Sequence, residues 1–233
     1  MLINLFRSGF SRESVISLLL FIPVILISLT VHEYCHGYAA YKCGDSTAKW
    51  HNRLTLNPLR HLDPIGTIMM LVVGFGYASP VPINPRNFRN YRRDLCIVSL
   101  AGPLSNIFLA FIGLILHYTV YQIIFLAGDN AFSILSSNLF MMWTTFILSF
   151  IHANATLAVF NLIPIPPLDG SRIVSVILPD RVSAFFDKYE RYIMLVVFIL
   201  IWRGSLDGII TTLGSKLISV LDWVVTLIPF TFL

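Results

Sequence analysis

Long apolar runs, separated by short polar segments, dominate the chain. The first run extends from about Val15 to Tyr41, and its residues from Val15 to Thr30 carry no charge. Two further runs cover about Leu95 to Leu126 and about Phe132 to Asn161. A helix of ~20 apolar residues is long enough to cross a hydrocarbon core of ~30 Å. The pattern therefore predicts three core transmembrane helices.

The segments that follow the first and third runs are less regular. Ile65 to Tyr77 is apolar but too short to cross as a helix, which indicates a re-entrant or interfacial element. Three prolines within residues 78–85 exclude a helix there and favour an extended edge or a loop. Tyr192 to Trp202 and Ile209 to Leu233 allow either two tilted spans or one span and an interfacial helix. We therefore expect an all-α polytopic membrane protein with a short membrane-associated β or re-entrant element after the first span, and one or two C-terminal helices.

The composition agrees with this pattern. Of the 233 residues, 56% are hydrophobic and 12% are charged, and the mean hydropathy is +0.78. Soluble domains carry about 25% charged residues. Because no stretch outside the apolar runs is long enough to fold by itself, we expect one membrane-embedded domain over residues 1–233. Its core would cover about residues 14–180, and its C-terminal helices about residues 187–233.

The charge distribution predicts the topology. The segment from Lys42 to Arg93 holds eight basic residues against two aspartates, and such an excess marks a cytoplasmic segment. The N-terminus is then outside, and the inner end of the first span faces the cytoplasm. The net charge of +4 follows from this membrane topology and does not indicate nucleic-acid binding. The three cysteines form no C-x-x-C pair, which argues against a disulfide framework or a cysteine zinc site.

The inner end of the first run carries the motif His32-Glu33-x-x-His36. Residues four apart lie on one face of a helix, so the two imidazoles can bind one metal ion. Glu33 then lies beside the metal and can take a proton from a water molecule. A chance match, with both histidines as interfacial residues, is the alternative. Ionisable groups at this depth are costly unless they are paired, solvated or bound to metal, which favours the metal site.

A second polar group is expected at the same level of the membrane. Residues 161–170 contain three prolines and a glycine, which must unwind the end of the third span. Because the first and third spans run in the same direction, this break brings Asp169 level with the two histidines. Asp169 is a suitable third zinc ligand, with the fourth position left for water. Alternatively, or in addition, it is the N-cap of a helix from Ser171 to Leu178.

Two further polar residues lie on the third span. His152 is expected to pack or to hydrogen-bond, and it is the weaker alternative to Asp169 as a metal ligand. Asn154 is expected to hydrogen-bond to another helix.

Six sequence blocks occur in a fixed order: His32-Glu33-x-x-His36, Leu54–Pro58, Asp63–Thr67, Pro80–Pro85, Ala101–Asn106 and Phe160–Gly170. Over about residues 20–180, this set resembles the site-2 protease family of zinc intramembrane metalloproteases, in its compact prokaryotic type without appended regulatory domains. The resemblance implies one Zn²⁺ per chain, held by His32, His36 and Asp169, with Glu33 as the general base. It also implies that Asn161, eight residues before Asp169, polarises the scissile carbonyl or stabilises the oxyanion.

The resemblance further implies an integral protein of a prokaryotic plasma membrane that cleaves a transmembrane protein substrate. Its partners would be that substrate and the lipid bilayer, with no nucleic acid; the oligomeric state stays open. The segment 78–85 would belong to a short membrane-associated sheet near the site. Here the family more often has Trp-Ala-Lys than this chain's Tyr77-Ala78-Ser79.

Two other functions compete with a protease. A metal transporter would place ionisable groups along a path or show internal repeats. This chain has one compact cluster and no repeat, which disfavours transport. A zinc-binding relative without protease activity is disfavoured because every proposed catalytic residue is present.

Overall fold

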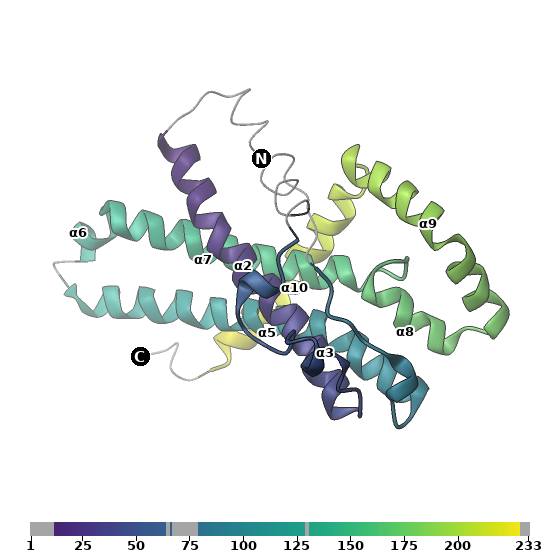
Figure 1. Cartoon of the computed structure of the whole chain (residues 1–233). Coiled ribbons are helices and arrows are strands. Elements are labelled where there is room, and N and C mark those ends of the chain that lie inside the picture. The colour runs from purple at the N-terminus through teal and green to yellow at the C-terminus, as the bar shows by residue number, and fades with distance from the viewer. Residues whose placement is uncertain (1–11, 64–65, 67–78, 129–130, 229–233) are drawn as a thin grey trace.

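The computed structural model describes residues 12–63, 66, 79–128 and 131–228 (Figure 1). The described residues form helices and connecting loops, and they contain no β-strand. The α-helices are α2 (Arg12–Lys42), α3 (Thr47–Trp50), α5 (Tyr91–Leu126), α6 (Ala131–Leu135), α7 (Asn138–Asn161), α8 (Asp169–Ile177), α9 (Asp180–Trp202) and α10 (Asp207–Thr226). Two short 3₁₀ helices, η1 (Pro58–Arg60) and η2 (Pro85–Asn87), lie in the segment between α3 and α5.

Four of these helices, α2, α5, α7 and α10, are long and apolar enough to cross a membrane. Helices α2, α5 and α7 contact one another, α10 packs against α5 and α7, and α8 lies against α5. The close approach of α5 and α7 depends on Gly113, since a Cβ atom there would lie 2.8 Å from Ile151 Cγ1. Small residues at such crossings let helix backbones approach closely in membranes. The expected all-α membrane architecture is confirmed at this level.

Capping side chains determine where two of these helices begin. Asn90 precedes α5 and accepts a hydrogen bond from Arg93 N, and Ser137 precedes α7 and accepts one from Phe140 N. Such caps satisfy N–H groups that have no partner inside the helix. The cap at Ser137 also explains a difference from the sequence-based expectation. The third apolar run, expected as one helix from about Phe132, is divided into α6 and α7.

The C-terminal part contains two long helices, and only one of them is a candidate membrane span among the described residues. Helix α10 is long and apolar enough to cross, whereas α9 is not among the candidate spans. Helix α9 carries charged residues in its first half, and it projects away from the α5–α7 pair (Figure 1). Of the alternatives for this region, the structure favours one span and one further helix.

The buried carboxylate of Asp45 links the segment before α5 to the end of α2 by hydrogen bonds. Asp45, just after α2, accepts hydrogen bonds from Asn84 N at 2.7 Å and from Asn87 Nδ2 at 2.8 Å. It also accepts one from Thr47 N at 3.1 Å. Residues 79–84 are non-helical, as their prolines require, but they form no strand, so the short sheet expected for this segment is not seen in its described residues. The re-entrant element expected at Ile65–Tyr77 lies, apart from Gly66, outside the described residues.

Candidate metal centre

Three side chains from distant parts of the chain converge at one point. His32 and His36 lie one turn apart on α2, and their Nε2 atoms are 3.0 Å from each other. Asp169 Oδ2, at the start of α8, lies 3.3 Å from His32 Nε2 and 3.1 Å from His36 Nε2. Both histidines are buried, and Asp169 is partly buried. The three residues expected from the sequence as metal ligands are therefore neighbours in the fold.

The sequence around Asp169 explains why its carboxylate reaches this point. The Pro-rich segment ends α7 at Asn161, and the chain turns back so that α8 starts at Asp169. Gly170 makes this turn sterically feasible, because a Cβ atom there would overlap the carbonyl oxygen of Leu162. The N-cap of α8 is Leu168, and no side chain caps the helix. The capping role considered for Asp169 is therefore not seen, and its carboxylate faces the histidines instead.

The Nδ1 atoms of both histidines, which face away from the cluster, form hydrogen bonds. His32 Nδ1 lies 2.5 Å from Asn106 Oδ1, and His36 Nδ1 lies 2.7 Å from the carbonyl oxygen of Val98, both on α5. A carbonyl oxygen only accepts, so each Nδ1 must carry the hydrogen in the neutral imidazole. Each Nε2 then offers a lone pair to the centre. Metal-binding histidines are commonly oriented in this way.

The donor set matches a divalent cation and is poorly matched without one. Two Nε2 lone pairs and a carboxylate oxygen face one another at 3.0–3.3 Å, which is repulsive unless a positive charge lies among them. A tetrahedral zinc site with bonds of about 2.0–2.1 Å places neighbouring ligand atoms ~3.3 Å apart. The residues present therefore fit zinc.

One glycine leaves the space beside these nitrogens open. A Cβ atom on Gly102 of α5 would overlap His36 Nε2 and would lie 2.7 Å from His32 Nε2. Every other residue type has this atom, so only glycine lets α5 pass so close to both histidines.

Glu33 lies next to the cluster in sequence and is held by the loop before α5. Its Oε2 accepts a hydrogen bond of 2.9 Å from the backbone N–H of Val81. This loop comes from the proline-containing segment for which the sequence predicts an extended edge or a loop. Glu33 is thus oriented by a main-chain group, as expected of a side chain that must present its carboxylate in a fixed direction.

The remaining residues considered from the sequence lie outside the three-residue cluster. Asn161, at the end of α7, donates from Nδ2 to the carbonyl oxygen of Leu157 at 3.0 Å. His152 is exposed on α7, with Nδ1 2.9 Å from the carbonyl oxygen of Leu148, so it is not a neighbour of the cluster. Asn154 is buried and bonds to Asn106, in agreement with the contact to another helix that the sequence predicts.

A family model for peptidase family M50 matches residues 20–203. The chain belongs to peptidase family M50. YwhC of Bacillus subtilis (strain 168) is 44% identical over 193 residues, which are 82% of this chain and 80% of that protein. The M50 match also makes this chain a site-2 protease-like metalloendopeptidase, as the resemblance of its sequence blocks implies.

More distant M50 relatives agree. Rip2 of Mycolicibacterium smegmatis is 29% identical over 187 residues, covering 78% of this chain and 66% of that protein. MJ0611 of Methanocaldococcus jannaschii is 30% identical over 145 residues, covering 61% of this chain and 62% of that protein. All three relatives carry provisional names as zinc metalloproteases, which supports zinc as the metal. No solved structure matches the chain significantly.

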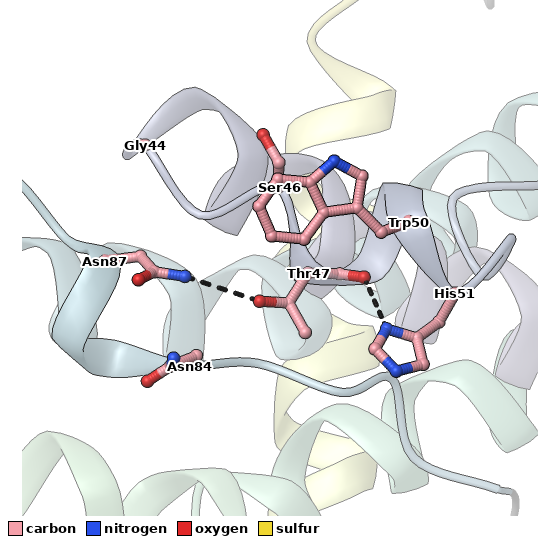
Figure 2. A pocket seen from close by; sticks show the side chains of 7 residues that line it. All are labelled: Gly44, Ser46, Thr47, Trp50, His51, Asn84 and Asn87. Carbon is pink, nitrogen blue, oxygen red and sulfur yellow. Dashed lines mark hydrogen bonds between the residues drawn. The ribbon is translucent and has the colours of Figure 1, made fainter.

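A hollow beside the end of α2 is separate from the cluster of His32, His36 and Asp169. Figure 2 shows Thr47 between Asn87 and His51, with hydrogen bonds to both, and Trp50 above them. None of the three clustered residues lines this hollow. Three of its lining residues, Thr47, Asn84 and Asn87, also donate hydrogen bonds to Asp45.

Proposed function

We propose that this M50 member hydrolyses a peptide bond within or near a transmembrane segment of a membrane-protein substrate. The observation that supports this most directly is that His32, His36 and Asp169 form one cluster, with both histidines buried on a helix long and apolar enough to cross a membrane. A protease that acted only on soluble peptides would have little reason to bury its site at such depth. The family provides the peptidase chemistry, and the place of the histidines on an apolar helix supports a membrane segment as the proposed substrate.

In this proposal His32 Nε2, His36 Nε2 and Asp169 Oδ2 hold one zinc ion per chain. When bound there, zinc supplies a Lewis acid that activates water and polarises a peptide carbonyl. Glu33 takes the proton from the attacking water and later gives it to the leaving nitrogen. The Val81 N–H bond to Oε2 leaves the other carboxylate oxygen for this proton transfer.

Asn161 is assigned the stabilisation of the oxyanion. Its Nδ2 carries two hydrogens, and only one is needed for the bond to Leu157. The second hydrogen can be donated to the oxygen on which negative charge develops. A substrate helix hides its carbonyl groups in its own hydrogen bonds, so the segment must unwind before it reaches these residues.

The basic excess between α2 and α5 supports an orientation with the N-terminus outside and the site open to the cytoplasm. By the resemblance to the compact prokaryotic type, the membrane is a prokaryotic plasma membrane. We further propose that residues 1–233 act as one membrane-embedded domain, with the core at about residues 14–180.

Metal content and cleavage measured on the same preparations test the proposal. The purified wild-type protein is expected to hold about one zinc per chain and to cleave a transmembrane substrate in detergent or liposomes. His36→Ala and Asp169→Ala are expected to lose both zinc and cleavage. Full zinc occupancy in Asp169→Ala would remove Asp169 from the ligand set. Cleavage of soluble unfolded peptides alone, with none of membrane segments, would overturn the proposed substrate class.

A further inference from the structure

Two buried asparagines connect the proposed zinc ligand His32 to the backbone of a third helix. Asn106 on α5 and Asn154 on α7 both have no exposed surface. Asn154 Nδ2 donates to the carbonyl oxygen of Phe150 at 2.9 Å, and Asn106 Nδ2 donates to Asn154 Oδ1 at 2.8 Å. Asn106 Oδ1 then lies 2.5 Å from His32 Nδ1. The row of hydrogen bonds runs from α7 through α5 to α2.

The direction of every bond in this row is determined. The carbonyl of Phe150 can only accept, so Asn154 must turn its amino group toward it and its oxygen toward Asn106. Asn106 must then turn its amino group toward Asn154, which leaves its oxygen for His32. Since that oxygen only accepts, His32 Nδ1 carries the hydrogen, and His32 Nε2 keeps its lone pair for the metal.

Asn106 also fixes the helix turn that carries His32. Its Nδ2 lies 3.4 Å from the carbonyl oxygen of Ser28, which is one turn before His32 on α2. The side chain therefore contacts α2 at two points, the backbone at Ser28 and the ring of His32. Any buried asparagine between membrane helices can hold them together. This one ends on a proposed ligand, which simple helix association would not require.

His36 differs from His32 in the kind of acceptor that its Nδ1 contacts. His36 Nδ1 is held by the backbone carbonyl of Val98, and no substitution of a side chain removes that acceptor. The orientation of His32, in contrast, depends on replaceable groups. His36 therefore serves as an internal reference for His32.

We propose that Asn106, itself oriented by Asn154, is a positioning residue that sets the Nδ1–H tautomer of His32 and directs its Nε2 toward His36 and Asp169. The inference rests on the proposed zinc site. Loss of the Asn106 amide would weaken metal binding more than it weakens the fold, because this amide orients the His32 ring in addition to holding the helices together.

Zinc affinity and thermal stability, measured in parallel by chelator competition and by unfolding in detergent, separate the two roles. Asn106→Leu, similar in size but without an acceptor, is expected to weaken zinc binding by about 10–100-fold. Asn106→Asp keeps an acceptor for His32 and is expected to bind zinc more tightly than Asn106→Leu, although a buried carboxylate lowers stability more. A purely structural role predicts the same rank order for affinity and stability. Ser99→Ala, at a buried α5 hydroxyl with no partner among the described residues, is the control and should keep wild-type affinity.

The tautomer provides a readout that needs no metal. In metal-free protein labelled with ¹⁵N-histidine, the His32 signal, assigned by its loss in His32→Gln, should be that of the Nδ1–H form. Asn106→Leu should shift His32 to a mixture of tautomers and leave His36 unchanged. An unchanged His32 signal together with wild-type zinc affinity in Asn106→Leu would overturn the inference.

A second variant covers the case in which Asn106→Leu does not fold. Asn154→Leu removes the group that orients Asn106, and it should weaken zinc binding several-fold; wild-type affinity there would equally overturn the inference. The His32→Gln variant distinguishes this inference from the proposed function. If His32→Gln binds zinc as tightly as the wild type, the zinc site itself is wrong. If it loses zinc while both asparagine variants keep it, only the positioning role is wrong.

Discussion

The backbone N–H of Val81 donates a hydrogen bond of 2.9 Å to the carboxylate of Glu33. Pro80 and Pro82 flank Val81, and neither has an N–H, so this loop offers a single main-chain donor at that point. Val81 is itself buried, and it packs against α2 beside Gly37, where a Cβ atom would lie 3.1 Å from Val81 Cγ1. The loop and the helix together therefore fix the direction of the proposed general base.

Glu33→Gln keeps an oxygen that can accept from Val81 but cannot take up a proton. We expect the cleavage rate to fall by about 10²–10⁴-fold, the usual contribution of general acid–base catalysis. Zinc content should stay at the wild-type level, since Glu33 is not a proposed ligand. Glu190→Gln, at an exposed site on α9, is the matched control and should cleave normally. Parallel loss of zinc in Glu33→Gln would instead place Glu33 in the metal site.

Gly37→Ala tests whether the position of the Val81 loop matters. The added methyl group must displace Val81 Cγ1 by a few tenths of an ångström, which lengthens or tilts the bond to Glu33. An alanine within a helix also adds up to about 1 kcal/mol of stability relative to glycine. We expect the cleavage rate to fall several-fold while zinc content and thermal stability are maintained.

Gly208→Ala provides the comparison for this variant. Gly208 lies in α10, and no atom of the part of the chain that the structure describes is within 4 Å of a Cβ atom there. This variant should gain stability and keep the full cleavage rate. Equal rates in both variants would show that the loop position does not control Glu33.

Gly102→Ala is expected to abolish zinc binding. A Cβ atom at Gly102 would overlap His36 Nε2, so either the histidine or the α5 backbone must move away from the metal. Gly113→Ala, also on α5, meets the side chains of Ile151 and Phe150 and should lower stability by about 1–3 kcal/mol, as overpacking does, with zinc retained. Zinc analysis and thermal unfolding of the two proteins check the prediction. Equal zinc content in both would mean that α5 can shift without disturbing the histidines.

The site residues on α2 could be predicted because they lie close together in the sequence. His32, Glu33 and His36 lie within five residues, and helix periodicity alone places both histidines on one face. Asp169 required a further step, from the helix break and the shared direction of two spans. Its position beside both histidines agrees with that reasoning.

The supporting residues could not be assigned from spacing. Asn106 lies 74 residues from His32, and the two meet only because α2 and α5 cross at this level. The sequence indicates close helix packing at Ala101–Asn106, but it does not show that Gly102 faces the histidines or that Asn106 bonds to one. An asparagine within an apolar run does signal a need for a partner, and the identity of that partner depends on the packing of the helices.

The hydrogen bonds of Asp45 that hold the loop before α5 should make the stability of the protein depend on pH. Burial alone would raise the pKa of Asp45, but hydrogen bonds from Thr47, Asn84 and Asn87 hold it below its usual value. Because the pKa is lower in the folded protein, the ionised carboxylate stabilises the fold above the unfolded-state value of ~4. This contribution is lost as the pH falls through the lower, folded-state value.

Asp45→Asn should therefore lower the free energy of unfolding by about 1–3 kcal/mol near neutral pH, because a neutral amide accepts fewer and weaker hydrogen bonds from Thr47, Asn84 and Asn87. The difference from the wild type should shrink as the pH falls below about 4, where Asp45 of the unfolded chain becomes protonated, and it should be smallest below the lower, folded-state pKa. Thermal unfolding of both proteins between about pH 3 and about pH 7 measures this difference, and effects of other carboxylates cancel because both proteins share them. Asp207→Asn, exposed at the start of α10, should show a small difference across the range. A constant gap between wild type and Asp45→Asn down to the lowest pH would mean that the ionised form of Asp45 does not hold the loop.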